Sequence, residues 1–160
     1  MNLNDVLPLR PSTSPPPPSP HLYEAPLCIL VVDDDPIARE YLAETLRSQG
    51  HEVLTLGAAA GAAAVVRERG VDAVVVDVTL PDMRGDVLAR RLREEGWGRD
   101  LGIVLVSGRT NEELQRLAAL SSADAAVTKA EVDSQLLREV IRARRRRHQT
   151  SRPGRAVRSG

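Results

Sequence analysis

The run Ile29-Leu30-Val31-Val32-Asp33-Asp34-Asp35 places three acidic residues directly after an apolar, largely β-branched segment. Three further apolar runs end at a polar residue: residues 74–76 before Asp77, 103–106 before Ser107, and 125–127 before Lys129. Short apolar runs of this kind are typical of strands that are buried on both faces of a parallel sheet. The carboxyl ends of such strands lie along one edge, where ligands bind. The sequence therefore predicts one crevice that collects these polar side chains.

Helix patterns alternate with the strand patterns along the chain. We expect strands at about 27–32, 52–56, 72–76, 102–106 and 124–128, and helices at about 36–49, 58–69, 86–95, 111–120 and 132–145. Asp35 is the expected N-cap of the first helix because Pro36 suits the first helical position. Its buried face is expected to comprise Ile37, Tyr41, Leu42 and Leu46. The alternation predicts an α/β fold, a flavodoxin-like (βα)5 doubly wound parallel sheet with strand order 2-1-3-4-5.

The charges are segregated along the chain, although the formal net charge is zero. Residues 142–160 contain eight arginines and no acidic residue, whereas residues 21–141 carry a net charge of −8. Residues 8–20 are rich in Pro and Ser, a composition typical of disordered or polyproline II segments. We expect a disordered extension over residues 1–25, a folded domain over 26–143, and a disordered Arg-rich tail over 144–160. A tail of this length is too short for a second folded domain.

The expected compartment is the cytoplasm. Cys28 is the single cysteine, which excludes an internal disulfide and fits a reducing environment. The amino terminus lacks the features of a signal peptide. No apolar run approaches the roughly 20 residues that a transmembrane helix needs. We therefore expect a soluble protein with no membrane contact.

The chemistry of the predicted crevice follows from its side chains. Lys129 is the only lysine beside 21 arginines, which indicates that this position needs a compact ammonium group. The acidic residues Asp33, Asp34 and Asp77 supply the oxygen ligands that Mg²⁺ prefers. Together with Ser107 they form a candidate site for a divalent cation and a phosphoryl group. An Asp77 carboxylate in this setting would act as a nucleophile toward phosphorus.

These motifs resemble those of the receiver domain of two-component response regulators, over about residues 26–142. The resemblance rests on Asp33-Asp34 after the first strand, on the segment Asp77 to Gly85, and on Ser107 and Lys129. It implies that Asp77 is the phosphoacceptor, that Lys129 pairs with it, and that Ser107 is the switch hydroxyl. Mg²⁺ would be the cofactor and a sensor histidine kinase or phosphotransfer protein the phosphodonor. Output would go through protein–protein interaction, as a monomer or as a dimer formed through helices four and five.

Two positions depart from the family pattern. Ala130 follows the lysine where the family usually has Pro, and we expect a trans peptide bond there because a cis bond to Ala costs several kcal/mol. Ala126 stands where the family often has an aromatic residue that moves with the switch hydroxyl. We expect phosphorylation to survive the change at Ala126, but not the usual aromatic readout.

Three alternatives remain at this point. The tail, through Arg144 to Arg147, could hold a nucleic-acid backbone. The chain could be an unphosphorylated scaffold with a receiver fold. An aspartate-nucleophile phosphohydrolase is disfavoured because Pro36-Ile37 replaces the Gly-Thr expected of that class. We therefore expect no turnover enzyme, only self-phosphorylation and slow dephosphorylation.

Overall fold

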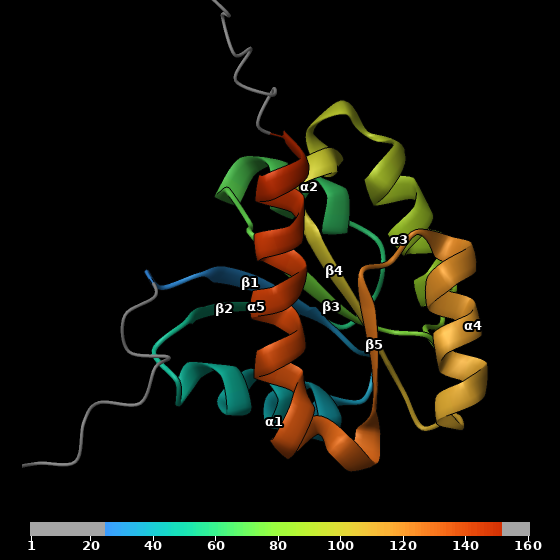
Figure 1. Cartoon of the computed structure of the whole chain (residues 1–160). Coiled ribbons are helices and arrows are strands. Elements are labelled where there is room, and N and C mark those ends of the chain that lie inside the picture. The colour runs from blue at the N-terminus through green and yellow to red at the C-terminus, as the bar shows by residue number, and fades with distance from the viewer. Residues whose placement is uncertain (1–24, 152–160) are drawn as a thin grey trace, which may run out of the picture.

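The computed structural model describes residues 25–151, so residues 1–24 and 152–160 lie outside the described part of the chain. It contains one five-stranded parallel sheet with the order β2-β1-β3-β4-β5, which confirms the predicted topology (Figure 1). The strands are β1 (Cys28–Val32), β2 (Glu52–Leu56), β3 (Ala73–Asp77), β4 (Gly102–Ser107) and β5 (Ala125–Thr128). Each expected strand is present, within one or two residues of its predicted ends.

Five α-helices cover the two faces of the sheet (Figure 1). They are α1 (Pro36–Arg47), α2 (Ala62–Arg69), α3 (Gly85–Glu94), α4 (Asn111–Ser121) and α5 (Val132–Ser151). One apolar core joins the sheet to α1 and α5, and a second joins it to α2, α3 and α4. The central strands contribute to both cores because alternate side chains point to opposite faces. Their continuous apolar runs are thus explained by burial on both sides.

The strand register brings the predicted functional residues to one edge of the sheet. Val32 of β1 is level with Val76 of β3, and Asp77 is level with Val106 of β4. Ser107 pairs in turn with Thr128 of β5. The residues that follow these positions therefore emerge side by side, as the sequence predicts.

The buried face of α1 differs from the expected one. Asp35 caps the helix as predicted, and its side chain accepts a hydrogen bond from the Ile37 amide. However, Ile37 is 81% exposed and Tyr41 is 48% exposed, so the prediction that they are buried is wrong. At 100° per residue these two lie on one stripe, while Leu42 and Leu46 lie on the opposite stripe that faces the sheet.

Helix α2 begins four residues later than expected. Residues 58–61 form a turn instead, and Gly61 precedes the helix with a left-handed backbone at φ 84°. The carboxylate of Asp82 accepts hydrogen bonds from the amides of Ala59 and Ala60. These amides are thereby satisfied without a helical turn.

Helix α5 continues to Ser151, past the expected end near residue 145, so the expected start of the disordered tail at residue 144 falls within a helix. The reason is internal pairing: Arg144 contacts Asp72 and Arg147 contacts Asp124. The rest of the expected tail, residues 152–160, lies outside the described residues. Within the described part, no helix is both long and apolar enough to cross a membrane.

Candidate functional site

The side chains predicted to share a crevice come from adjacent segments at the carboxyl edge of the sheet. Asp33 and Asp34 follow β1, Asp77 is the last residue of β3, Ser107 is the last residue of β4, and Lys129 follows β5. Each sits where a buried strand meets a loop. The sheet therefore fixes the backbone at these positions while the side chains face the edge.

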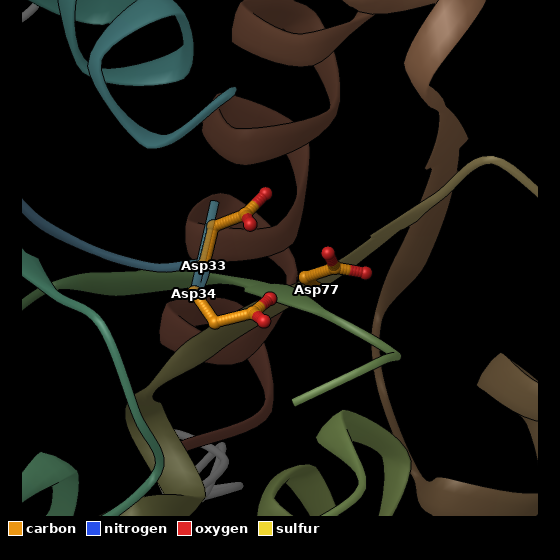
Figure 2. Close-up of side chains that lie close together, drawn as sticks. All are labelled: Asp33, Asp34 and Asp77. Atoms are coloured by element: carbon orange, nitrogen blue, oxygen red, sulfur yellow. The ribbon is translucent and has the colours of Figure 1, made fainter. Parts of the chain in front are cut away.

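The acidic cluster, defined as Asp33, Asp34 and Asp77, is compact (Figure 2). One carboxylate oxygen from each residue lies within 4.8 Å of the other two. Asp33 is fully buried, Asp77 is 5% exposed, and Asp34 is open to solvent. The cluster thus has two buried carboxylates and one at the mouth of the site.

Lys129 supplies the positive charge of the site. Its Nζ lies 3.0 Å from Oδ2 of Asp77, to which it donates a hydrogen bond, and 3.2 Å from Oδ2 of Asp33. Burial by itself lowers the pKa of Lys129, but the contacts with Asp77 and Asp33 outweigh burial and raise that pKa. The ammonium is therefore held in its charged form between two carboxylates.

One ammonium leaves the three carboxylates incompletely neutralised. Asp33 Oδ1 accepts a hydrogen bond from the Asp35 amide, but the buried Oδ2 has no hydrogen-bond partner within the described chain. Its contact with Lys129 has the geometry of an ion pair only. Burial, with the charge of Asp77 beside it, raises the pKa of Asp33. A buried, unsatisfied oxygen within a set of carboxylates fits a hard divalent cation such as Mg²⁺.

The loop after Asp77 is held by backbone contacts. The Thr79 amide donates to Oδ1 of Asp77, and the Gly85 amide donates to the Val78 carbonyl at 2.8 Å. A side chain at Gly85 would place a Cβ 2.0 Å from the Asp77 carbonyl oxygen, so only Gly fits there. This close turn keeps α3 packed under the Asp77 segment.

Sequence reasoning did not assign the role of Asp82. Its carboxylate ties this loop to the β2–α2 turn through the Ala59 and Ala60 amides, at 3.0 and 2.8 Å. These hydrogen bonds to the charged form lower the pKa of Asp82. No sequence signal identifies the partners, because they lie more than twenty residues away and contribute only backbone groups.

The Ser107 side of the site is formed by the loop that leads into α4. Ser107 is 2% exposed, and its hydroxyl oxygen accepts a hydrogen bond from the Arg109 amide at 3.2 Å. Behind it, the carbonyl of Ala126 accepts a hydrogen bond from the Gln115 side chain. The described residues contain no cis peptide bond, which confirms the trans bond expected at Ala130.

The match to a known family extends over most of the folded chain. Residues 29–142 match the family model described as the response regulator receiver domain. The chain belongs to this family. It is thus a receiver domain of two-component signalling, a class of domains that act as signalling modules rather than as turnover enzymes.

Curated relatives agree with this assignment. Transcriptional regulatory protein AruR of Pseudomonas aeruginosa is 39% identical over 97 residues, which cover 58% of this chain and 38% of the relative. DNA-binding response regulator MtrA of Mycolicibacterium smegmatis is 36% identical over 121 residues, covering 76% of this chain and 51% of the relative. The chain therefore spans about half or less of the length of these relatives.

Solved structures show the same fold. A sensor protein from Polaromonas sp. JS666 superimposes with a TM-score of 0.70 at 30% identity, over 78% of this chain and 99% of that chain. A CheY-like receiver domain protein from Methanospirillum hungatei JF-1 gives a TM-score of 0.68 over 79% and 99%. The second is 22% identical, so it supports the fold alone.

Proposed function

We propose that this receiver domain is phosphorylated on Asp77 by a sensor histidine kinase or a phosphotransfer protein. The observation that carries the proposal is the setting of Asp77. Its carboxylate lies at the end of a buried strand, 3.0 Å from the only lysine of the chain and within 4.8 Å of two further carboxylates. These are the groups that a carboxylate nucleophile for phosphorus requires.

In the proposed reaction, a carboxylate oxygen of Asp77 forms a bond to phosphorus. The bond between phosphorus and the imidazole nitrogen of the donor histidine breaks, and that nitrogen keeps the electron pair. Lys129 then moves its hydrogen bond from Asp77 to a phosphoryl oxygen, which needs little motion because the ammonium already touches this carboxylate. Its raised pKa keeps it charged throughout.

Asp33, Asp34 and Asp77 are the residues proposed to hold Mg²⁺. When bound, this ion would neutralise negative charge as the phosphoryl group approaches the cluster. Asp33 suits this role because its buried Oδ2 has no hydrogen-bond partner. Asp34 suits it because it is open to solvent and lies beside the other two.

Ser107 is proposed to report the phosphorylated state. Its hydroxyl can donate a hydrogen bond to a phosphoryl oxygen on Asp77, which ends the neighbouring strand. Because the Arg109 amide bonds to the same hydroxyl oxygen, the start of the β4–α4 loop would move with it. With Ala126 behind this loop in place of an aromatic ring, displacement of the loop and α4 is the proposed readout.

The proposed output is a change in protein–protein contacts around α4 and α5, either with another protein or within a dimer, in the cytoplasm. The scaffold alternative is disfavoured because the acidic cluster, Lys129 and Ser107 lie at one edge of the sheet. A scaffold that is never phosphorylated has no need of a lone lysine between two buried carboxylates.

The test is intact-mass analysis after incubation with acetyl phosphate, with and without Mg²⁺. We expect one added phosphoryl group that requires Mg²⁺ and is lost in Asp77→Ala. The control is Asp86→Ala, which removes another buried acidic residue, at the start of α3. An adduct that persists in Asp77→Ala would refute the assigned acceptor. No adduct on the folded protein with any small phosphodonor would favour the scaffold.

A further inference from the structure

Two connecting segments flank the point where Asp33 and Asp34 leave β1. They are the β2–α2 turn, residues 57–61, and the β3–α3 loop, residues 78–84. Strand β1 lies between β2 and β3 in the sheet, so these segments start on opposite sides of it (Figure 1). Because β2 and β3 are not neighbours, a direct contact between the two segments has to pass the carboxyl end of β1.

The side chain of Asp82 makes such a contact, hereafter the Asp82 bridge. One of its carboxylate oxygens accepts a hydrogen bond from the Ala59 amide at 3.0 Å, and the other accepts one from the Ala60 amide at 2.8 Å. These hydrogen bonds lower the pKa of Asp82, so the carboxylate stays ionised at neutral pH. An ionised acceptor makes the stronger kind of hydrogen bond. Two bonds to consecutive amides also fix the direction of the carboxylate.

Further contacts link each side of the Asp82 bridge to a residue of the acidic cluster. On the β2 side, the carbonyl of Leu56 accepts a hydrogen bond from the Asp33 amide at 3.1 Å. On the β3 side, the Thr79 amide donates to Oδ1 of Asp77 at 3.1 Å. The contacts thus form a ring that runs from Asp33 through both segments to Asp77. Lys129 closes this ring because it contacts both carboxylates.

The two segments are also packed against the sheet by apolar side chains. Ala59 in the turn and Val78 and Leu80 in the loop are all buried in the core that the sheet shares with α2, α3 and α4. This packing remains when the bridge is removed. Loss of the bridge should therefore loosen the positions of the two segments without unfolding the domain.

Asp82 is outside the acidic cluster, and both of its oxygens are bound by amides. Its effect on a bound cation would therefore act through the residues that it positions.

We propose that Asp82 is a positioning residue for the Mg²⁺ site, because its bridge holds the Asp33 and Asp77 carboxylates at the separation that the cation needs. This inference rests on the proposed function, in which the acidic cluster holds Mg²⁺. Without the bridge, the ion has to bind carboxylates whose loops are free to shift. Groups that orient metal ligands from outside the coordination shell change metal affinity by about 10- to 100-fold when they are removed.

The test is thermal unfolding of the full chain at increasing Mg²⁺ concentration, which gives the Kd for Mg²⁺ from the rise in Tm. Asp82→Ala removes both hydrogen bonds, whereas Asp82→Asn keeps one acceptor oxygen. We expect Asp82→Ala to weaken the Kd about tenfold and Asp82→Asn about threefold.

Phosphorylation by acetyl phosphate gives a second readout. The Mg²⁺ concentration at half of the maximal rate should rise by the same factor as the Kd. The rate at saturating Mg²⁺ should stay within about threefold of wild type, because the bridge contributes to binding of the ion and not to the attack by Asp77.

Two control variants separate positioning from stability and from charge. The carboxylate of Asp72 also links two segments through an amide, that of Cys28 at 2.8 Å, but at the amino-terminal edge of the sheet. Asp72→Ala should therefore lower Tm and leave the Kd for Mg²⁺ unchanged. Glu95→Ala removes an exposed acidic residue that directly follows α3, and should leave both unchanged.

Several outcomes would overturn the inference. An unchanged Kd in both Asp82 variants, when the wild type binds Mg²⁺, would do so and leave the proposed function intact. Equal weakening in Asp82→Ala and Glu95→Ala would assign the effect to net charge, and equal weakening in Asp82→Ala and Asp72→Ala would assign it to lost stability. A wild-type Tm that does not respond to Mg²⁺ would remove the metal site itself, and the proposed role of the acidic cluster with it.

Discussion

Mg²⁺ should stabilise this fold, and Asp33→Asn should remove that stabilisation. In the acidic cluster, one ammonium faces three carboxylates, and the buried Oδ2 of Asp33 lacks a hydrogen-bond partner. An ion that binds only the folded state at a hundred times its Kd adds about 2.7 kcal/mol to the free energy of unfolding. For a domain of this size, about 4 °C per kcal/mol corresponds to a rise of about 10 °C in Tm.

In the absence of Mg²⁺, Asp33→Asn should raise the free energy of unfolding above that of the wild type. Burial raises the pKa of Asp33 above its ordinary value of 3.8, so the ionised form is disfavoured in the folded state. The free energy of unfolding therefore falls as the pH rises from 3.8 through the folded pKa, and the deficit persists at neutral pH. The neutral amide avoids it while retaining an acceptor for the Asp35 amide. We expect Asn to add about 1 kcal/mol, or about 4 °C in Tm.

The assay is thermal unfolding with and without Mg²⁺, and Asp35→Asn is the matched control. Asp35 carries the same charge and lies two residues away, but it caps α1 and is outside the acidic cluster. Because Asn caps helices about as well as Asp, this variant should keep both its stability and the full Mg²⁺ response. Equal Mg²⁺ responses in Asp33→Asn and wild type would refute the metal site.

Three further predictions concern stability. Asp124→Asn leaves the buried guanidinium of Arg93 without its counter-charge. It should lower the free energy of unfolding, measured by urea denaturation, by about 3 kcal/mol. A loss below about 1 kcal/mol would show that the backbone carbonyl contacts are enough to stabilise this guanidinium. Gly85→Ala places a Cβ 2.0 Å from the Asp77 carbonyl oxygen, so it should lower the free energy of unfolding by at least about 2 kcal/mol. It should also slow phosphorylation, as measured by intact mass over time. Wild-type stability and phosphorylation rate in this variant would contradict the close turn. Burial lowers the pKa of His51 below 6.5, so the stability that is present above pH 6.5 is lost as the pH falls toward the folded pKa. His51→Gln should therefore reduce the dependence of the urea midpoint on pH between pH 7 and 5. An unchanged pH dependence would assign the loss to other groups.

The strands and the candidate site were predictable because their signals are local. A run such as 29–32 is apolar on every residue, which indicates burial on both faces wherever it lies in the fold. Parallel strands necessarily align their carboxyl ends, so a polar residue after each run identifies the site without knowledge of any distance. Asp77 and Lys129 are 52 residues apart in sequence, yet both were placed at the same edge by this argument.

The errors arose where two faces or two distant segments had to be distinguished. Ile37 and Tyr41 were assigned to the core because they are apolar and four residues apart, but that stripe faces solvent. Which apolar stripe of α1 faces the sheet depends on how the helix docks. That orientation is set where Leu42, Ala43 and Leu46 pack in the core, and it is not encoded in the helix pattern alone.

The sequence by itself determined the fold class, the strand order and which polar residues gather at one edge of the sheet, since apolar periodicity and strand ends are properties of short segments. Only the tertiary structure decided what the arginines near the carboxyl end do. A run of four arginines is typical of a solvated tail, but Arg144 contacts Asp72 and Arg147 contacts Asp124. These aspartates directly precede β3 and β5, at the amino-terminal edge of the sheet. Arg144 is 72 positions from Asp72 in the sequence, and Arg147 is 23 positions from Asp124. Only the packing of α5 on the sheet brings these residues together.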